Sequence, residues 1–416
     1  MKKFPLASCI SIFLICGSGL KSDTTFEDDF LQYWNDVREN YAYFQKKHTD
    51  WEKVKKYYSG LAFNASSRED LIRILEKANE ELYDNHFNLN TNLNTSTRMV
   101  PSGLDLWAEF IKDKAVVTEV RYGFSAWRAG IRPGMIITKI NGIEVEQAVK
   151  TNLGHCITTV DNEVMDFVLR QLLAGNYITE RVITLRDEQR TLNIQPDKSD
   201  GNLTDGFKYD SLLQVRILSG NTGYVRINNS LGDNELIKAF DSALLILKDT
   251  RALVLDLRET PGGGNSTVAR AIMSRFIDTE MPYQKHVVPQ EEMSFGVKRS
   301  WLELVTPRGP FTYNRKMVVL CSHWTGSMGE GIVIGFDAMK RATIIGSKMA
   351  GLNGSVDDFI TTNYKVPFSF PTEQLFHVNG SPREDFIPEI QVDLTDKKSL
   401  TDPDPVLNEG LKFLSQ

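Results

Sequence analysis

The sequence has few histidines and cysteines, and after its first twenty residues it has no long apolar run. It contains six His and four Cys in 416 residues. It has no CxxC pair and no Cys/His spacing of a metal site, so a metal-stabilised fold is not predicted. No later stretch reaches the ~18 uncharged apolar residues that a membrane-spanning helix needs, so we expect the mature chain to be soluble.

Basic clusters are also missing. The 48 Lys+Arg against 54 Asp+Glu give a net charge of −6, and no basic run contains interleaved aromatic residues. This argues against a nucleic-acid partner, because phosphate binding needs a basic face. Hydrophobic residues make up 41% of the chain and charged residues 25%, which is typical of a well-cored globular protein. At ~100–200 residues per domain, the length predicts two or three domains.

The N-terminus has the pattern of a secretory signal peptide. Lys2 and Lys3 precede an apolar stretch from Leu6 to Cys16, and the small residues 17–19 follow. The apolar stretch is too short to span a bilayer. We therefore predict a signal peptide over residues 1–22 and an exported protein, either periplasmic or attached to the surface.

The four cysteines leave two questions open. Cys9 and Cys16 lie in or near the apolar stretch, so a lipid anchor remains an alternative, although neither residue has the usual surroundings for one. Cys156 and Cys321 belong to the mature chain. An exported protein can join such a pair in a disulfide, and two lone buried thiols are the equal alternative.

Hydrophobic periodicity divides the first half of the chain. Residues 23–97 carry apolar side chains every three to four positions and are predicted to form a helical segment. Residues 98–192 combine strand-like alternation with a Gly-stopped short helix and an Asn141-Gly142 turn, which predicts a β-rich domain. Residues 193–210 are polar and rich in turn formers, as in a linker.

The second half, residues 211–416, has a different pattern. Continuous apolar stretches alternate with helical ones, which predicts an α/β domain with a largely parallel sheet. The expected strands are 223–227, 252–257, 317–321 and 342–346, and the expected helices are 234–248, 266–277 and 327–340.

Ser327 is the first candidate for catalysis. In VVLCSHWTGSMGE (318–330) a buried strand runs into a small-residue turn, and Ser327 falls where the next helix begins. Free N–H groups and the helix field favour an oxyanion there, which suits a nucleophile. The same position suits an ordinary N-cap, and the sequence does not decide between the two. The spacing is not GxSxG, so membership of the α/β-hydrolases is unsupported.

A second candidate segment is DLRETPGGGN (256–265). It follows another buried strand at the carboxyl end, where α/β folds place ligand sites. Its glycines allow close backbone approach and could form half of an oxyanion hole or a phosphate cradle. A tight turn that needs positive φ would explain them equally. The segment matches neither common nucleotide-binding motif.

These segments resemble peptidase family S41, which includes the tail-specific proteases, the tricorn-core-like proteases and the interphotoreceptor retinoid-binding repeats. DLRETPGG resembles the family's DLRxNxGG loop, and TGSMGE followed by KRATIIG resembles its nucleophile segment. AWRAGIRPGMIITKINGIEV (126–145) is similar to the second half of a PDZ domain, and LYDNHFNL (82–89) to the family's L-x-D-G-H segment. The resemblance implies a PDZ-like domain over 98–192 and a ClpP/crotonase-like catalytic domain over 211–416.

The resemblance implies Ser327 as the nucleophile and raises the question of its base. Tail-specific proteases use a lysine in an FGKG segment, but Leu352 stands at that position, and Lys348 matches a non-catalytic one. The tricorn-like branch uses a histidine that matches His86, so the chain resembles the branch without a Ser–Lys dyad. An imidazole with a pKa of ~6.5 can act as a general base near neutrality. His323, close to Ser327 in sequence, is the competing base.

Three further roles are implied by the resemblance. Glu384 is the candidate for the late glutamate of this branch, with Asp385 as its rival. The N–H groups of Met328 and of Gly262 or Gly263 are the candidates for the oxyanion hole. A loop similar to one that holds a peptide carboxylate is formed by Gly103, Leu104, Asp105 and Leu106. Repulsion by Asp105, or a PDZ-like domain that serves only as a spacer, are the alternatives for that loop.

We therefore predict an exported serine peptidase that hydrolyses peptide bonds of unfolded or tail peptides and uses no metal or organic cofactor. Its partner would be a peptide or protein substrate. The alternative is a catalytically inactive S41-like protein that binds ligands or peptides, as the retinoid-binding branch shows for this fold. An esterase for small substrates is a third interpretation. The sequence predicts no oligomeric state.

Overall fold

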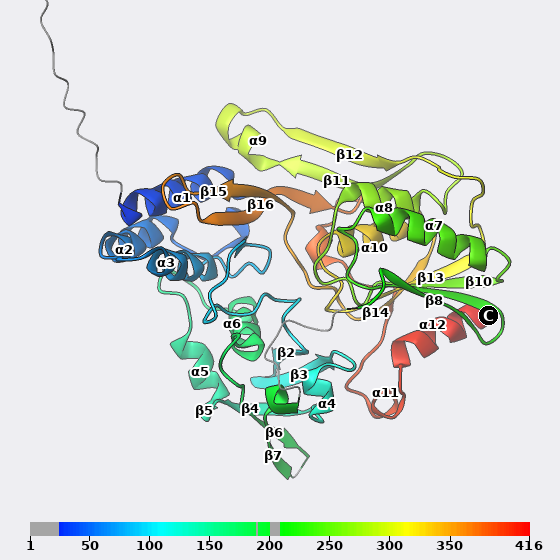
Figure 1. Cartoon of the computed structure of the whole chain (residues 1–416), viewed down its shortest axis with the longest axis horizontal. Helices are drawn as coiled ribbons and strands as arrows, with labels where there is room; N and C mark the ends of the chain where they lie inside the picture. Colours follow the sequence, from blue (N-terminus) through cyan, green and yellow to red (C-terminus); the bar gives the residue numbers. More distant parts are fainter. Residues whose placement is uncertain (1–24, 189, 200–208) are drawn as a thin grey trace, which may run out of the picture.

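The computed structural model describes residues 25–188, 190–199 and 209–416. The predicted signal peptide and residues 200–208 of the predicted linker lie outside the described residues. Figure 1 shows helices at the start of the chain, a β-rich unit beneath them, and a larger α/β unit that holds the C-terminus. This mixed α/β architecture, with a helical segment first, confirms the predicted fold class.

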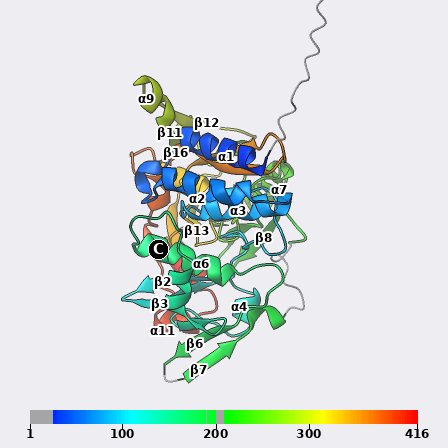
Figure 2. The ribbon, with the colours of Figure 1, turned by 90° about the vertical axis from the view of Figure 1, so that its left-hand side faces the viewer.

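Three helices form the N-terminal segment, and Figure 2 shows them side by side. They are α1 (Phe26–Asn40), α2 (Trp51–Phe63) and α3 (Arg68–Glu80), with a 3-10 turn at Phe44–Lys46. Each of the three begins at a side chain that accepts a backbone N–H, namely Thr25, Asp50 and Ser67. Their apolar faces share a core with Val366, Phe368 and Phe370 from the far end of the sequence.

The β-rich unit, here called the middle unit (residues 98–199), is built around one antiparallel sheet. Its strand order is β2 (Leu106–Ile111), β3 (Lys114–Val120), β4 (Ile136–Ile140), β6 (Ile183–Asp187), β7 (Arg190–Ile194), with β5 (Ile143–Glu144) beside β4. It also contains α4 (Ser125–Arg128), α5 (Val145–Thr151), α6 (Asn162–Ala174) and a 3-10 turn at Pro196–Ser199. The core includes Trp324 of the α/β unit, so the two units are packed together.

The α/β unit contains a six-stranded sheet in which only β8 runs antiparallel. The order is β17 (Ile390–Gln391), β14 (Thr343–Gly346), β13 (Lys316–Cys321), β10 (Ala252–Asp256), β9 (Thr222–Ile227), β8 (Leu213–Leu218). One face is covered by α7 (Glu235–Leu247), α8 (Ser266–Met273) and α10 (Met328–Ala338), and the other by α12 (Pro405–Ser415), which follows α11 (Lys397–Thr401). The predicted parallel sheet is confirmed.

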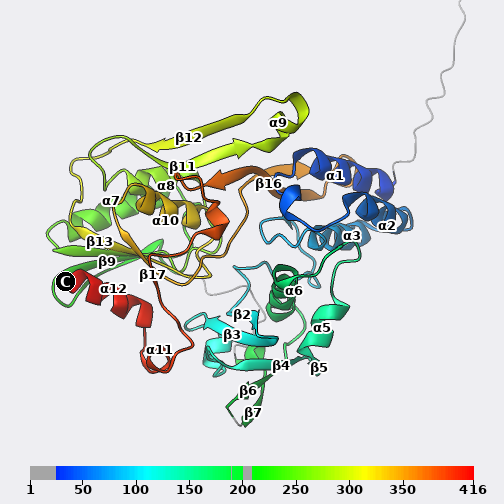
Figure 3. The same ribbon diagram turned by 180° about the vertical axis from the view of Figure 1, so that it is seen from behind.

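A second, antiparallel sheet was not predicted. Its order is β1 (Asn88–Leu89), β16 (Pro367–Phe376), β11 (Met281–Val288), β12 (Arg299–Val305), with β15 (Ser355–Ile360) beside β16, and α9 (Pro289–Phe295) joins β11 to β12. Figure 3 shows β16 reaching from the α/β unit to the N-terminal helices. Because Asn88 pairs with Ser369, the segment around residue 86 is attached to the α/β unit.

Within the described ranges, no helix is both long and apolar enough to cross a membrane. Cys156 and Cys321 are buried free thiols, which decides between the disulfide and the lone-thiol alternatives. In the same part of the chain, no group of three or more His, Cys, Asp or Glu side chains could hold a metal ion.

Candidate active site

Ser327 lies in a strained backbone conformation between β13 and α10. Its φ is 51° and its ψ is −115°. An ordinary N-cap serine has an extended backbone with negative φ. A non-glycine residue at such angles costs ~1–3 kcal/mol, and residues of this kind cluster at active sites. A sharp, strained turn from strand to helix also exposes the nucleophile of α/β-hydrolases. The backbone therefore favours a nucleophile over a cap, although GxSxG is absent.

Glu330 connects the Ser327 turn to the loop 351–354. Its fully buried carboxylate accepts the N–H of Ser327 at 2.8 Å, of Gly351 at 2.9 Å and of Leu352 at 3.3 Å. Burial raises the pKa of this carboxyl to about 7. The sequence motif contained Glu330 only as a landmark, although Ser327-x-x-Glu330 has the spacing of a capping box, in which the glutamate accepts the N–H of the cap residue. The bonds from Gly351 and Leu352 had no signature in the sequence.

His86 follows α3 in a tight turn and is 9% exposed. Its Nδ1 lies 2.5 Å from the carbonyl oxygen of Asn353. A carbonyl only accepts, so Nδ1 carries the hydrogen and Nε2 has the lone pair of a base. Burial, followed by the positive charge of Arg383, lowers the pKa of His86 to about 4. The imidazole is therefore neutral at neutral pH, as a general base must be.

Asp84 holds both His86 and its partner. One carboxylate oxygen accepts the backbone N–H of His86 at 2.9 Å, and the other accepts the hydroxyl of Tyr41 at 2.7 Å and the side-chain amide of Asn353 at 2.9 Å. Sequence analysis missed Asp84, Tyr41 and Asn353. An acidic residue two positions before the candidate histidine was the available signal.

His323, the competing base, is bound to the middle unit. Its Nδ1 lies 2.6 Å from a carboxylate oxygen of Glu119 on β3, and its ring stacks on Trp107 with the centroids 4.6 Å apart. In the described structure neither imidazole forms a hydrogen bond with the Ser327 hydroxyl. Catalytic hydrogen bonds are often long without substrate and tighten in the complex, so this geometry excludes neither residue by itself.

The two candidates for the late glutamate differ in burial. The Glu384 side chain is 8% exposed and that of Asp385 66%. Glu384 accepts Lys46 Nζ at 2.7 Å through one oxygen, and its other oxygen is buried with no hydrogen-bond partner. Arg383 is the neighbour that reaches the site loop, where it donates to the carbonyls of Leu352 at 2.8 Å and Gly354 at 2.9 Å.

Gly263 lies directly against Ser327. A β-carbon added to it would come within 2.4 Å of the Ser327 β-carbon, and its φ is 62°. The amides of the glycine loop are already in use, since Gly262 donates to Asn229 Oδ1 at 2.8 Å and Gly263 to the Thr260 carbonyl at 3.2 Å. Among the described residues the Met328 N–H has no partner. Of the predicted oxyanion donors, only that amide is free in this conformation.

Leu352 occupies an apolar position at the nucleophile turn. The side chain is 4% exposed, and its Cδ1 would lie 3.2 Å from a β-carbon on Gly326. The loop 351–354 therefore presents a leucine to the turn before Ser327, and its next residue, Asn353, binds His86.

The predicted peptide-binding loop is closed on itself. The amides of Gly103 and Leu104 donate to carbonyls within the loop, at 2.6 Å and 3.1 Å. The Asp105 carboxylate is paired with Arg181 at 2.7 Å, and Leu104 and Leu106 are buried. In this conformation the loop belongs to the core of the middle unit and presents no open amides to a carboxylate.

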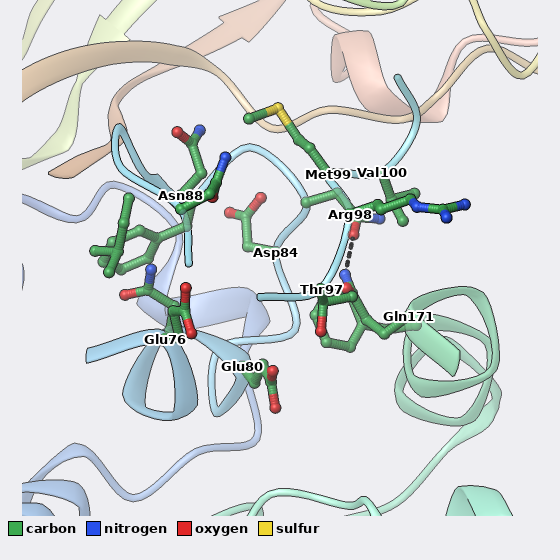
Figure 4. A pocket seen from close by; sticks show the side chains of 15 residues that line it. Glu76, Glu80, Asp84, Asn88, Thr97, Arg98, Met99, Val100 and Gln171 are labelled. Carbon is green, nitrogen blue, oxygen red and sulfur yellow. Dashed lines mark hydrogen bonds between the residues drawn. The ribbon is translucent and has the colours of Figure 1, made fainter. Parts of the chain in front are cut away.

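A pocket of about 90 Å³ lies beside the His86 turn, between α3 and the middle unit. Figure 4 shows Asp84 in it, with Glu76 and Glu80 on one side and Gln171 on the other. The side-chain amide of Gln171 donates to Asn85 Oδ1 at 3.0 Å, so the turn that carries His86 also contacts α6.

Comparison with solved structures supports the fold. Mature CPAF is similar with a TM-score of 0.61 at 13% identity over 94% of this chain and 95% of that chain. The photosystem II D1 C-terminal processing protease is similar with a TM-score of 0.55 at 17% identity, over 91% and 96%. A lipoprotein from Streptococcus agalactiae is similar with a TM-score of 0.51 at 11% identity, over 98% and 99%.

Family models match two stretches of the chain. Residues 22–79 match the tricorn protease C1 domain, and residues 221–392 match peptidase family S41. The second match contains the glycine loop, Ser327, Glu330 and the loop up to Asn353. Residues 221–392, which carry Ser327, therefore match peptidase family S41, a family of serine proteases.

Proposed function

We propose that this protein is an exported serine peptidase that cleaves unfolded or tail peptides, with Ser327 as nucleophile and His86 as general base. The observation that carries the proposal is the strained backbone of Ser327, which sits against Gly263 at the start of α10. The surroundings maintain a conformation that a structural cap does not need.

The chemistry follows from the position of each hydrogen. As Ser327 Oγ attacks the carbonyl carbon of the peptide, its proton moves to His86 Nε2, because Nδ1 is held by the Asn353 carbonyl. His86 then protonates the leaving amine. Water, deprotonated by the same nitrogen, releases the acyl group from Ser327. A base of this kind typically contributes 10²–10⁴-fold in rate.

Oxyanion stabilisation starts from the free Met328 N–H. The second donor would come from the glycine loop once substrate displaces one of its internal acceptors, the Asn229 side chain or the Thr260 carbonyl. One such donor is worth roughly 10²–10³-fold in rate. On this proposal, the oxyanion hole gains its second donor only when substrate binds.

The loop 351–354 supports the branch without a Ser–Lys dyad. Leu352 cannot accept a proton, and the carbonyl of the following Asn353 instead orients the imidazole. The Glu384 side chain is hydrogen-bonded to Lys46 rather than to this loop, and the neighbouring Arg383 donates to the loop carbonyl of Leu352. We assign Glu384 rather than exposed Asp385 to the late-glutamate position.

The middle unit is proposed to be PDZ-like, from its order of short strands and helices and from the segment 126–145. Its closed 101–106 loop supports a role as a spacer at least as well as the capture of a carboxylate. Export rests on the N-terminal sequence pattern.

A fluorophosphonate probe tests the assignment. Intact mass of the wild-type protein should rise by one adduct, Ser327→Ala should take up none, and His86→Gln should label at least ~100-fold more slowly. His323→Gln is the matched control and should label at the wild-type rate. Labelling that persists in Ser327→Ala would remove the nucleophile. No labelling of any form would favour the inactive binding protein, and turnover of nitrophenyl esters without peptide cleavage would favour the esterase.

A further inference from the structure

The hairpin β11–α9–β12, here called the arm (residues 281–305), ends the second sheet with an open edge. β11 pairs with β16 on one side and β12 on the other, and in the described chain no strand pairs with the outer edge of β12. Figures 1 and 3 show the arm along one side of the molecule, with α9 at its tip beyond the α/β unit. Open edges are templates for pairing with another chain.

The arm also exposes large apolar side chains. Phe295 is 77% exposed and Leu302 47%. Six apolar residues of the arm each expose, on average, about half of their own surface: Met293, Phe295, Val297, Trp301, Leu302 and Leu304. These side chains lie on both faces of the hairpin, since Trp301 stands opposite His286 and the next residue, Leu302, opposite Lys285. Apolar side chains are therefore exposed on either side of the open edge.

The arm is held in a fixed shape. The two ring nitrogens of His286 lie 2.8 Å from a Glu373 oxygen and 3.0 Å from a Glu303 oxygen. The same ring stacks on Trp301 with the centroids 4.7 Å apart. At the tip, the side chain of Gln290 donates to the Asn40 carbonyl at the end of α1. A rigid edge loses little conformational entropy on pairing, which favours a permanent partner.

We propose that a second copy of this chain occupies the arm, with the two β12 strands paired antiparallel about a two-fold axis at Leu302. Such pairing sets each open edge against its own counterpart and joins the two second sheets into one. The Leu302 side chains meet at the axis and Ser300 lies opposite Leu304. The tip of each arm then comes beside the turn 306–310 of the other copy.

The position of the open edge and of the tip favours this occupant over a peptide. A single peptide strand would cover β12 and leave Met293 and Phe295 of the tip exposed. β11 also separates β12 from α10, which carries Ser327 at its start, so a peptide on β12 would lie away from the nucleophile. The proposal does not depend on catalytic activity.

Sedimentation analysis of the purified protein and of two charge variants tests the interface. The wild type should be dimeric. Leu302→Glu places two like charges at the axis and should raise the dimer Kd at least ~100-fold. Leu245→Glu on α7, where Leu245 is 52% exposed and outside the arm, is the matched control and should remain dimeric.

A cysteine at the axis tests the register independently of any effect of charge on folding. Directly opposite residues in antiparallel strands have Cα atoms ~4.5–5.5 Å apart, within the range of a disulfide. Leu302→Cys should therefore form a covalent dimer on mild oxidation, and Leu245→Cys should not. The two native thiols are buried. A monomeric wild type, a dimer that Leu302→Glu leaves intact, or a monomer that binds only added peptide on the arm would each overturn the proposal.

Discussion

The base assignment makes a specific prediction about pH, because a buried His86 should stay neutral far into the acid range. Burial, followed by the charge of Arg383, lowers its pKa from 6.5 to about 4. At pH 5.5 an imidazole with a pKa of 4 is ~97% neutral, whereas one with a pKa of 6.5 is ~9% neutral. A peptidase that uses His86 should therefore retain nearly all of its base at pH 5.5.

The same shift predicts how stability depends on pH. Because the pKa of His86 is lower in the folded state than in the unfolded state, its contribution to stability is complete above pH 6.5. That contribution is lost as the pH falls toward 4. A shift from 6.5 to about 4 corresponds to about 3 kcal/mol. The difference in free energy of unfolding between the wild type and His86→Gln should change by this amount between pH 7 and pH 4.

Two assays measure these quantities. Heteronuclear NMR of the imidazole ¹⁵N signals, assigned by their loss in His86→Gln, should give a titration midpoint near pH 4 for this residue. Urea unfolding at several pH values gives the stability difference. The rate of fluorophosphonate labelling should show no acid limb from His86 near pH 6.5.

A midpoint near 6.5 for the His86 signals would refute the reasoning. So would an acid limb near pH 6.5 in the labelling rate that persists in Glu330→Gln. That variant is needed because the Glu330 carboxyl, with a pKa raised to about 7, titrates in the same region.

Three further variants test other parts of the site. Gly263→Ala would push a β-carbon into Ser327 and should slow fluorophosphonate labelling at least ~100-fold, whereas Gly142→Ala, also at positive φ but with open space around it, should label normally. For Glu330 the folded pKa lies above the unfolded one, so its stability contribution is complete below pH 4.5 and lost as the pH rises through 7. Urea unfolding of Glu330→Gln should lack this loss of about 3 kcal/mol. Tyr41→Phe removes one donor from Asp84 and should cost ~1.5–3 kcal/mol of stability by urea unfolding while it slows labelling. A wild-type labelling rate in Tyr41→Phe would show that Asp84 does not position the base.

The sequence predicted the elements whose burial leaves a periodic pattern. β9, β10 and β13 are buried on both faces and read as continuous apolar stretches, and α1 to α3 repeat every three to four residues. The arm was missed because β12 is exposed on both faces and shows no such pattern. Pro289 at the start of α9 and Gly296 after its end were the signals that could have revealed it.

The site was predictable only where chemistry depends on side-chain type. Serine at the start of α10 suits both a nucleophile and a cap, and only the φ of Ser327 separates them. The acceptor for His86 is the main-chain carbonyl of Asn353, which any residue could supply, so no motif encodes it. The engaged amides of Gly262 and Gly263 likewise depend on conformation rather than on residue type.

The pairing of β1 with β16 has a consequence for the order in which activity appears. His86 and the carbonyl that orients it are 267 positions apart in the chain, and the strand that anchors the His86 segment includes Ser369. During synthesis from the N-terminus, His86 is therefore made long before the Asn353 carbonyl that orients it and the strand that anchors its segment. Closing so long a loop is also among the slower steps of folding. On the proposed mechanism, activity therefore appears only after residues 353–369 have joined the fold.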